Sequence, residues 1–94
     1  MAKRKTWKYY YSQSVTKATE GGPGVTWIVG LLRKELKYDK NVVVSSGHSL
    51  YVGQSTIDIF ATNKKSMNKA FKILVNADYI DNIKEGWRRV ERLR

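Results

Sequence analysis

The stretch NVVVSSGHSLYVGQSTIDIFA, residues 41–61, decides the fold class, because its β-branched and aromatic residues favour strands over helices. Every second residue of 57–61 is Ile or Ala, as in a strand that buries one face. The Gly-His pair at 47–48 and the Gly-Gln pair at 53–54 are both typical of two-residue type II′ hairpin turns. The stretch therefore predicts antiparallel strands, joined either by two turns or by one turn and one bulge.

One strand and two helices are predicted on either side of this stretch. Residues 6–15 are rich in aromatic and β-branched residues and predict a first strand. In residues 25–38, and again in residues 62–80, apolar side chains recur at spacings of three and four. This spacing is the pattern of an amphipathic helix with one buried face.

The C-terminal segment, DNIKEGWRRVERLR at 81–94, fits two structures. Its apolar residues fit one face of a helix, but Gly86 interrupts that helix at a cost of about 1 kcal/mol. Residues 87–93, which follow the glycine, also fit a final strand. We therefore expect a strand here in preference to a helix.

The resulting order, β-α-β-β-α-β, predicts a single small α+β domain over residues 1–94. Its expected arrangement is a ferredoxin-like split β-α-β sandwich, an antiparallel sheet with two helices on one face. Residues 1–5 are expected to form a mobile basic tail. The alternative is a winged-helix-like C-terminal half over residues 62–94, but it needs another helix where residues 41–61 predict strands.

The glycine-rich segment KATEGGPGVTWIVG, residues 17–30, resembles a phosphate-binding loop only in composition. A P-loop needs Lys after its last glycine, and here Val25 follows Gly24. The dinucleotide pattern G-x-G-x-x-G would need a glycine where Trp27 stands. The segment is therefore interpreted as the connection into a helix, and no cofactor is expected.

The charge of the chain is its strongest functional signal. Eighteen Lys and Arg residues against eight Asp and Glu residues give a formal net charge of +10, which favours a polyanionic partner. The absence of cysteine excludes disulfides and thiolate metal sites and fits a reducing compartment, so a cytoplasmic location is expected. No apolar run approaches the roughly 20 residues that span a bilayer, and no membrane partner is expected.

Basic residues on the two predicted helices and in the C-terminal segment are the candidates for contacts to nucleic-acid phosphates. They are Lys34, Lys37, Lys65, Lys69, Lys72, Arg88, Arg89 and Arg92. Helices on one side of a sheet leave the other face open, where aromatic side chains can stack on bases. Tyr10, Tyr51 and Trp87 are the candidates for this role. The same aromatic residues also suit a small core or a homodimer interface.

These features predict a small, non-enzymatic nucleic-acid-binding protein, with DNA and RNA both open. His48 is the only histidine, and no catalytic or metal-binding set accompanies it. One alternative is a protein-interaction module, such as a phage or viral inhibitor or accessory factor that docks on an acidic protein. A ribonuclease-like toxin is the third hypothesis, since such enzymes can act with Lys, Arg, Tyr and one acid.

Overall fold

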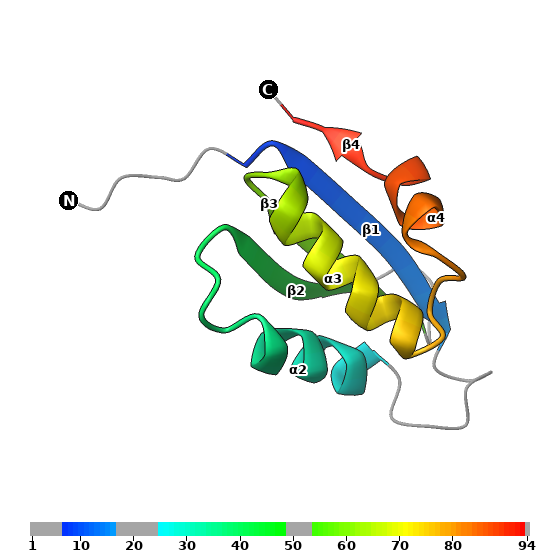
Figure 1. Cartoon of the computed structure of the whole chain (residues 1–94). Coiled ribbons are helices and arrows are strands. Elements are labelled where there is room, and N and C mark those ends of the chain that lie inside the picture. The colour runs from blue at the N-terminus through cyan, green and yellow to red at the C-terminus, as the bar shows by residue number, and fades with distance from the viewer. Residues whose placement is uncertain (1–6, 17–24, 49–53, 94) are drawn as a thin grey trace.

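The computed structural model describes residues 7–16, 25–48 and 54–93. The described elements follow the order β-α-β-β-α as far as α3, after which helix α4 and a short strand follow (Figure 1). The elements are β1 (Tyr9–Thr16), α2 (Val25–Glu35), β2 (Val42–His48), β3 (Gln54–Ala61), α3 (Lys64–Asn76), α4 (Ile83–Arg88) and β4 (Glu91–Arg92).

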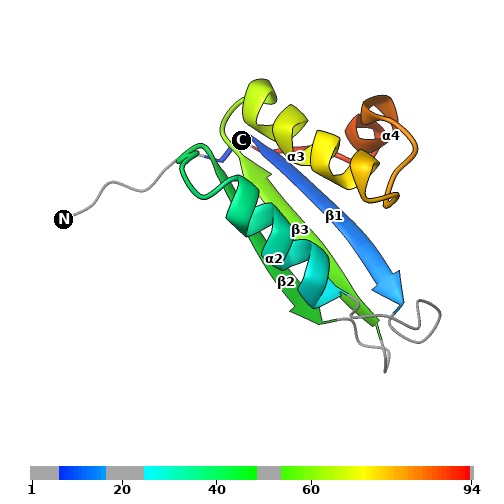
Figure 2. The same ribbon diagram turned by 60° about the horizontal axis from the view of Figure 1, so that its bottom comes forward.

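The four strands form one sheet in the order β2-β3-β1-β4, and each neighbouring pair is antiparallel. Helices α2 and α3 lie side by side on one face of this sheet, and α4 lies beyond α3 on the same side (Figure 2). The predicted α+β class and antiparallel sheet are confirmed. Two details differ from the expected order β-α-β-β-α-β. A third helix, α4, follows α3, and the last strand, β4, has only two residues.

The core lies between the sheet and the helices. Its largest fully buried side chains come from β1, α2, β3 and α3, and they are Tyr11, Phe71, Ile28, Leu32, Ile57, Ile59, Met67 and Leu74. The ring of Phe71 meets Tyr11 and Trp87 edge to face, with centroids 5.1 and 5.5 Å apart. Trp87 in turn meets Tyr9 at 5.4 Å, so aromatic contacts join β1, α3 and α4.

Helix α3 is capped at both ends. The side chain of Asn63 accepts a hydrogen bond from the amide of Ser66 at 2.8 Å, which caps the N-terminus. Asp78 adopts a left-handed φ of 63°, and the amide of Tyr79 donates to the carbonyl of Leu74 at 2.9 Å. This is the geometry of a Schellman motif, and it ends the helix earlier than the predicted boundary at residue 80.

The C-terminal segment combines both predicted structures. Helix α4 takes residues 83–88, and its N-cap Asn82 accepts a hydrogen bond from the amide of Glu85 at 2.9 Å. A Cβ at Gly86 would lie 2.9 Å from ring atoms of Phe71. The glycine therefore permits close packing of α4 on α3. The expected strand over 87–93 is correspondingly wrong for most of its length, since only Glu91 and Arg92 pair with β1.

Two local predictions in the strand region fare differently. Gly47 and His48 lie within β2, paired with Thr56 and Ser55, so no turn forms at that pair. Pairing with β3 extends the strand through a dipeptide whose composition suits a turn equally well. The connection at 49–53 lies outside the described residues, and so does the turn predicted at Gly53-Gln54, of which only Gln54, the first residue of β3, is described.

The winged-helix alternative for residues 62–94 is wrong. Strand β3, which ends at Ala61, stands where a helix-turn-helix requires a helix before α3. The glycine-rich connection at 17–24 and the predicted tail at 1–5 lie outside the described residues.

Candidate nucleic-acid interface

Positive charge is segregated between the two sides of the molecule. The sequences of β1, β2 and β3 contain no Lys or Arg. In the part of the chain that the structure describes, every Lys and Arg except Lys8 and Arg92 lies on a helix or in the turn beside one. Helices α2, α3 and α4 lie on one side of the sheet (Figure 2), so most of the described Lys and Arg residues belong to segments on that side.

The open face of the sheet carries an aromatic pair and two carboxylates. Tyr10 stacks on Phe60 with ring centroids 4.7 Å apart, and its hydroxyl donates to Asp58 at 2.8 Å. The hydroxyl of Thr56 donates to the same carboxylate at 3.0 Å. Glu91 lies opposite Tyr10 on β4. These carboxylates would repel phosphates from the open face, and the three long strands β1, β2 and β3 supply no Lys or Arg to offset them.

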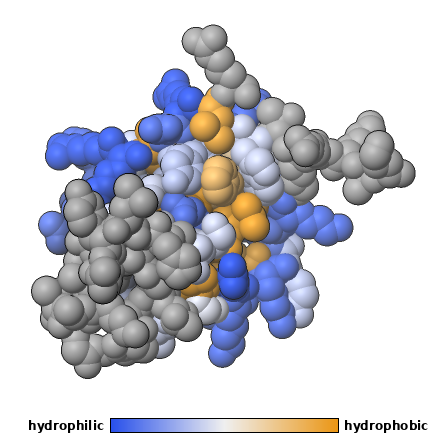
Figure 3. Space-filling model, turned by 180° about the vertical axis from the view of Figure 1, so that it is seen from behind, coloured by the Kyte–Doolittle hydropathy of each residue, from blue (hydrophilic) through white to orange (hydrophobic). Residues whose placement is uncertain are grey.

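The hydroxyl of Tyr10 is held in its neutral form. A hydrogen bond with Ser12 lowers the pKa of Tyr10, but burial and the negative charges of Asp58 and Glu91 raise it by more, so the pKa lies above its usual value of 10.0. The space-filling view of this face shows apolar and weakly polar surface across its middle (Figure 3). Val43, which is 44% exposed, contributes to this exposed apolar surface.

The structure does not assemble the predicted base-stacking set. Tyr10 lies on the open face, and Tyr51 lies outside the described residues. Trp87 lies on the helix side, against Tyr9 and Phe71. Its indole N–H donates to Oδ1 of Asn68 at 2.6 Å. The aromatic candidates therefore do not form one platform on the open face.

The predicted lysines of α3 are exposed, as their spacing requires. Lys65, Lys69 and Lys72 all face solvent, while the apolar residues of the helix face the sheet. Lys69 is half exposed and forms an ion pair with Asp39 at 3.2 Å. Lys65 and Lys72 form no ion pair among the described residues, so their ammonium groups are available to an external ligand.

Asp39 ties the turn after α2 to α3. Its carboxylate accepts hydrogen bonds from the amide of Asn41 at 2.9 Å, the hydroxyl of Ser66 at 2.9 Å and the ammonium of Lys69 at 3.2 Å. Burial raises the pKa of Asp39, but these hydrogen bonds and the charge of Lys69 together lower it by more. The net pKa lies below its ordinary value, so Asp39 is ionised at neutral pH.

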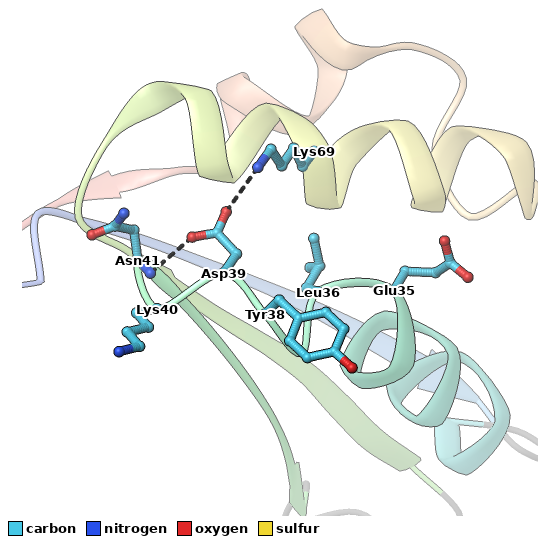
Figure 4. A pocket seen from close by; sticks show the side chains of 7 residues that line it. All are labelled: Glu35, Leu36, Tyr38, Asp39, Lys40, Asn41 and Lys69. Atoms are coloured by element: carbon cyan, nitrogen blue, oxygen red, sulfur yellow. Dashed lines mark hydrogen bonds and ion pairs between the residues drawn. The ribbon is translucent and has the colours of Figure 1, made fainter.

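A groove of about 450 Å³ runs between the end of α2 and α3 (Figure 4). Lys40 and Lys69 line it, but Glu35 and Asp39 do so as well. The predicted residues Lys34 and Lys37 are exposed near the end of α2, and the ammonium of Lys37 lies 4.9 Å from the ring centroid of Tyr38. The groove itself is therefore lined by both acidic and basic side chains, and further lysines are exposed near it.

A second groove, of about 370 Å³, lies on the other side of α3. Five of the residues that the structure describes line it. Two of them, Trp87 and Arg92, were predicted from sequence as binding residues, and the others are Lys64, Asn68 and Val90. Lys64 was not among the residues predicted from sequence. It is the first residue of α3 and lies one helical turn before Asn68. Only the return of α4 along α3 brings Lys64 and Arg92 to one groove.

The remaining two arginines are exposed at the end of α4. Burial raises the pKa of Tyr11, and the charge of nearby Arg89 lowers it by a smaller amount. Arg88 makes no ion pair among the described residues. The predicted cations thus occupy several separate sites around the helices.

The described residues contain no group of three or more His, Cys, Asp or Glu side chains placed to hold a metal ion. None of the helices in the described ranges has the length and apolar character needed to cross a membrane. Comparisons with protein-family models, with curated proteins and with solved structures gave no match.

Proposed function

We propose that this chain is a non-enzymatic nucleic-acid-binding protein whose helix side contacts phosphates. The segregation of charge carries the proposal. Eleven of the thirteen Lys and Arg residues that the structure describes lie on the three helices or in the turns beside them, while β1, β2 and β3 contribute no cation. Lys and Arg that neutralise phosphates release counterions, which is the main source of affinity in sequence-independent binding.

Helix α3 is the centre of the proposed surface. Lys65 and Lys72 are exposed on it and form no ion pair with any residue that the structure describes. Lys64 and Arg92 flank a groove along its other side. The first turn of α3 holds two lysines and no acidic residue, although its amide end already carries positive partial charge. A bound phosphate would relieve this repulsion.

The open face has a different role in this proposal. Tyr10 is already engaged with Phe60 and Asp58, and the carboxylates of this face oppose a polyanion. We therefore assign phosphate binding to the helices and no base stacking to the strands.

The proposal extends to fold family and location. Strand β3 pairs with both β1 and β2, and this supports a ferredoxin-like split β-α-β arrangement with α4 added. The absence of cysteine supports a cytoplasmic location.

Two sets of substitutions test the proposal by fluorescence anisotropy with labelled single-stranded and duplex DNA and RNA. The helix-side set is Lys65→Gln, Lys72→Gln and Arg88→Gln in one chain. At about 0.1 M salt each lost phosphate contact weakens binding by about tenfold, so the set of three should lose about 1,000-fold. The open-face set, Val43→Ser with Asp58→Asn, should bind as tightly as the wild type or slightly more tightly.

The opposite pattern, with binding lost only in the open-face set, would contradict the proposal. If the protein bound no nucleic acid at all, the proposal would be wrong. The alternative would then be an acidic protein partner that contacts the same Lys and Arg residues. The labelled strands should be recovered intact, and their cleavage would favour the ribonuclease hypothesis instead.

A further inference from the structure

We propose that the groove between α3 and the α4–β4 segment holds one unpaired nucleotide of a single-stranded nucleic acid. Its phosphate would lie between Lys64 and Arg92, and its base would pack against Trp87. This inference rests on the proposed function and deepens it, since it names the class of nucleic acid that the protein prefers.

The groove is built from two segments that are distant in sequence. Lys64 and Asn68 come from successive turns of α3, and Trp87, Val90 and Arg92 come from α4, β4 and the link between them. Its volume of about 370 Å³ falls within the range of sites that hold small ligands, about 300–1,000 Å³. Trp87 and Val90 are half-buried, so they offer apolar surface without being closed off from solvent.

The charge of this groove differs from that of the groove in Figure 4. Lys64 and Arg92 are exposed and make no ion pair among the described residues. None of the described residues that line the groove is acidic, whereas Glu35 and Asp39 line the other one. The sheet register places Arg92 opposite Tyr9 and its neighbour Glu91 opposite Tyr10, so the two side chains lie on opposite faces. A phosphate therefore meets cations here without a competing carboxylate.

The aromatic wall of the groove is held in place before any ligand binds. The indole of Trp87 meets Tyr9 and Phe71 edge to face and donates its N–H to Asn68. That bond occupies Oδ1 of Asn68 and leaves its amide NH₂ as a donor, for which the described residues offer no hydrogen-bond acceptor. A base edge carries acceptor oxygens and nitrogens that suit such a donor. Wall and donor are thus fixed in advance, which reduces the entropy lost on binding.

These features favour a single strand over a duplex. In a duplex the faces of each base are stacked on their neighbours, and an aromatic wall cannot reach them. Unpaired bases can be turned outward and packed on aromatic side chains, with about 1–3 kcal/mol per base as measured by alanine substitution. Lys65 and Lys72, which do not line the groove, can contact phosphates in either form, so the groove is the element that discriminates.

The test compares two double variants that remove the same charge. The groove variant carries Lys64→Gln and Arg92→Gln, and the control carries Lys84→Gln and Arg88→Gln, which are exposed on α4 and do not line the groove. Dissociation constants are measured for a single-stranded oligodeoxythymidine and for a duplex of the same length at one salt concentration. The groove variant should lose at least about tenfold more affinity for the single strand than for the duplex. The control should lose the same factor for both.

A second measurement follows Trp87 directly. In a chain with Trp7→Phe and Trp27→Phe, the only indole left is that of Trp87. Its emission should be quenched by the single-stranded oligonucleotide, and neither inorganic phosphate nor the duplex should quench it comparably.

Unchanged Trp87 emission at saturation, or equal losses for both nucleic acids in the groove variant, would overturn the groove inference alone. A wild-type protein that binds no nucleic acid would overturn the proposed function and the groove inference together.

Discussion

At the scale of single residues, Gly86 determines how α4 packs on α3. A Cβ at this position would lie 2.9 Å from the ring of Phe71, which is itself fully buried. Gly86→Ala should gain about 1 kcal/mol of helix propensity but lose more through overpacking, with a net loss of about 1–2 kcal/mol in the free energy of unfolding. Urea denaturation measures this change.

Gly30 provides the matched control, because it lies within α2, is exposed and has nothing within 4 Å of an added Cβ. Gly30→Ala should stabilise the protein by about 0.5–1 kcal/mol. Stabilisation of similar size by both substitutions would mean that α4 is not packed against Phe71 as the structure shows.

The same glycine explains why the C-terminal segment was difficult to predict. Intrinsic propensity counts Gly86 against a helix, and this reasoning favoured a strand after it. The compensating signals are the cap at Asn82 and the contact with Phe71. The first is readable from sequence, but the second depends on a residue fifteen positions away and appears only once α3 and α4 are packed.

Asp39 should make stability depend on pH. Its pKa is lowered in the folded protein, so its contribution is complete above the unfolded pKa of about 4 and is lost as the pH falls from there through the lower folded pKa. Asp39→Asn should cost about 1–2 kcal/mol at neutral pH and much less in acid. Thermal or urea unfolding at several pH values measures the difference.

Asp81→Asn is the control, since Asp81 is exposed and its carboxylate accepts no hydrogen bond among the described residues. Its effect should stay within about 0.5 kcal/mol. If the cost of Asp39→Asn is the same at pH 3 as at pH 7, the ionised carboxylate is not what ties the turn after α2 to α3.

At the scale of elements, α3 is the part of the molecule that sequence predicts best. Its apolar residues keep the helical period over thirteen residues, and Met67, Ala70, Phe71 and Leu74 are buried as expected. Helix α4 has only six residues, too few for a period to decide between helix and strand. The groove between α3 and α4 has no sequence signal at all, because Lys64 and Arg92 meet only through packing.

Helix α3 should separate stability from binding. Phe71→Ala should cost about 3–5 kcal/mol in the free energy of unfolding, because it empties the centre of an aromatic cluster. Lys65→Gln with Lys72→Gln should leave the thermal midpoint nearly unchanged, since exposed charges contribute little to folding. The pair should nevertheless weaken nucleic-acid binding by about 100-fold at about 0.1 M salt.

Lys69 is omitted from that pair because it is bonded to Asp39, and its loss would affect folding as well. Wild-type affinity in the folded double variant would make these two lysines ordinary solvated side chains. The binding surface would then have to lie around Lys64 and the arginines of the C-terminal segment.

At the scale of the whole molecule, the distribution of charge carries the functional account. Composition alone predicts a polyanionic partner, and periodicity predicts which lysines of α3 are exposed. The alternation at 57–61 predicts that Asp58 lies on the face opposite the core, but the sequence does not predict that Glu91 joins it there, since the register of β4 on β1 depends on the preceding helix. For the same reason it misassigns Trp87, whose ring turns toward α3 instead of the open face.

The most direct test of the account is the affinity of the wild-type protein for nucleic acid over a salt series. If four to six phosphates are neutralised by the helix side, log K should fall against log salt concentration with a slope of roughly −3 to −5. The helix-side variant with Lys65→Gln, Lys72→Gln and Arg88→Gln should show a slope smaller in magnitude by about 2–3. Affinity that does not change with salt, or a slope that the variant leaves unchanged, would contradict the central claim that the cations around the helices bind phosphates.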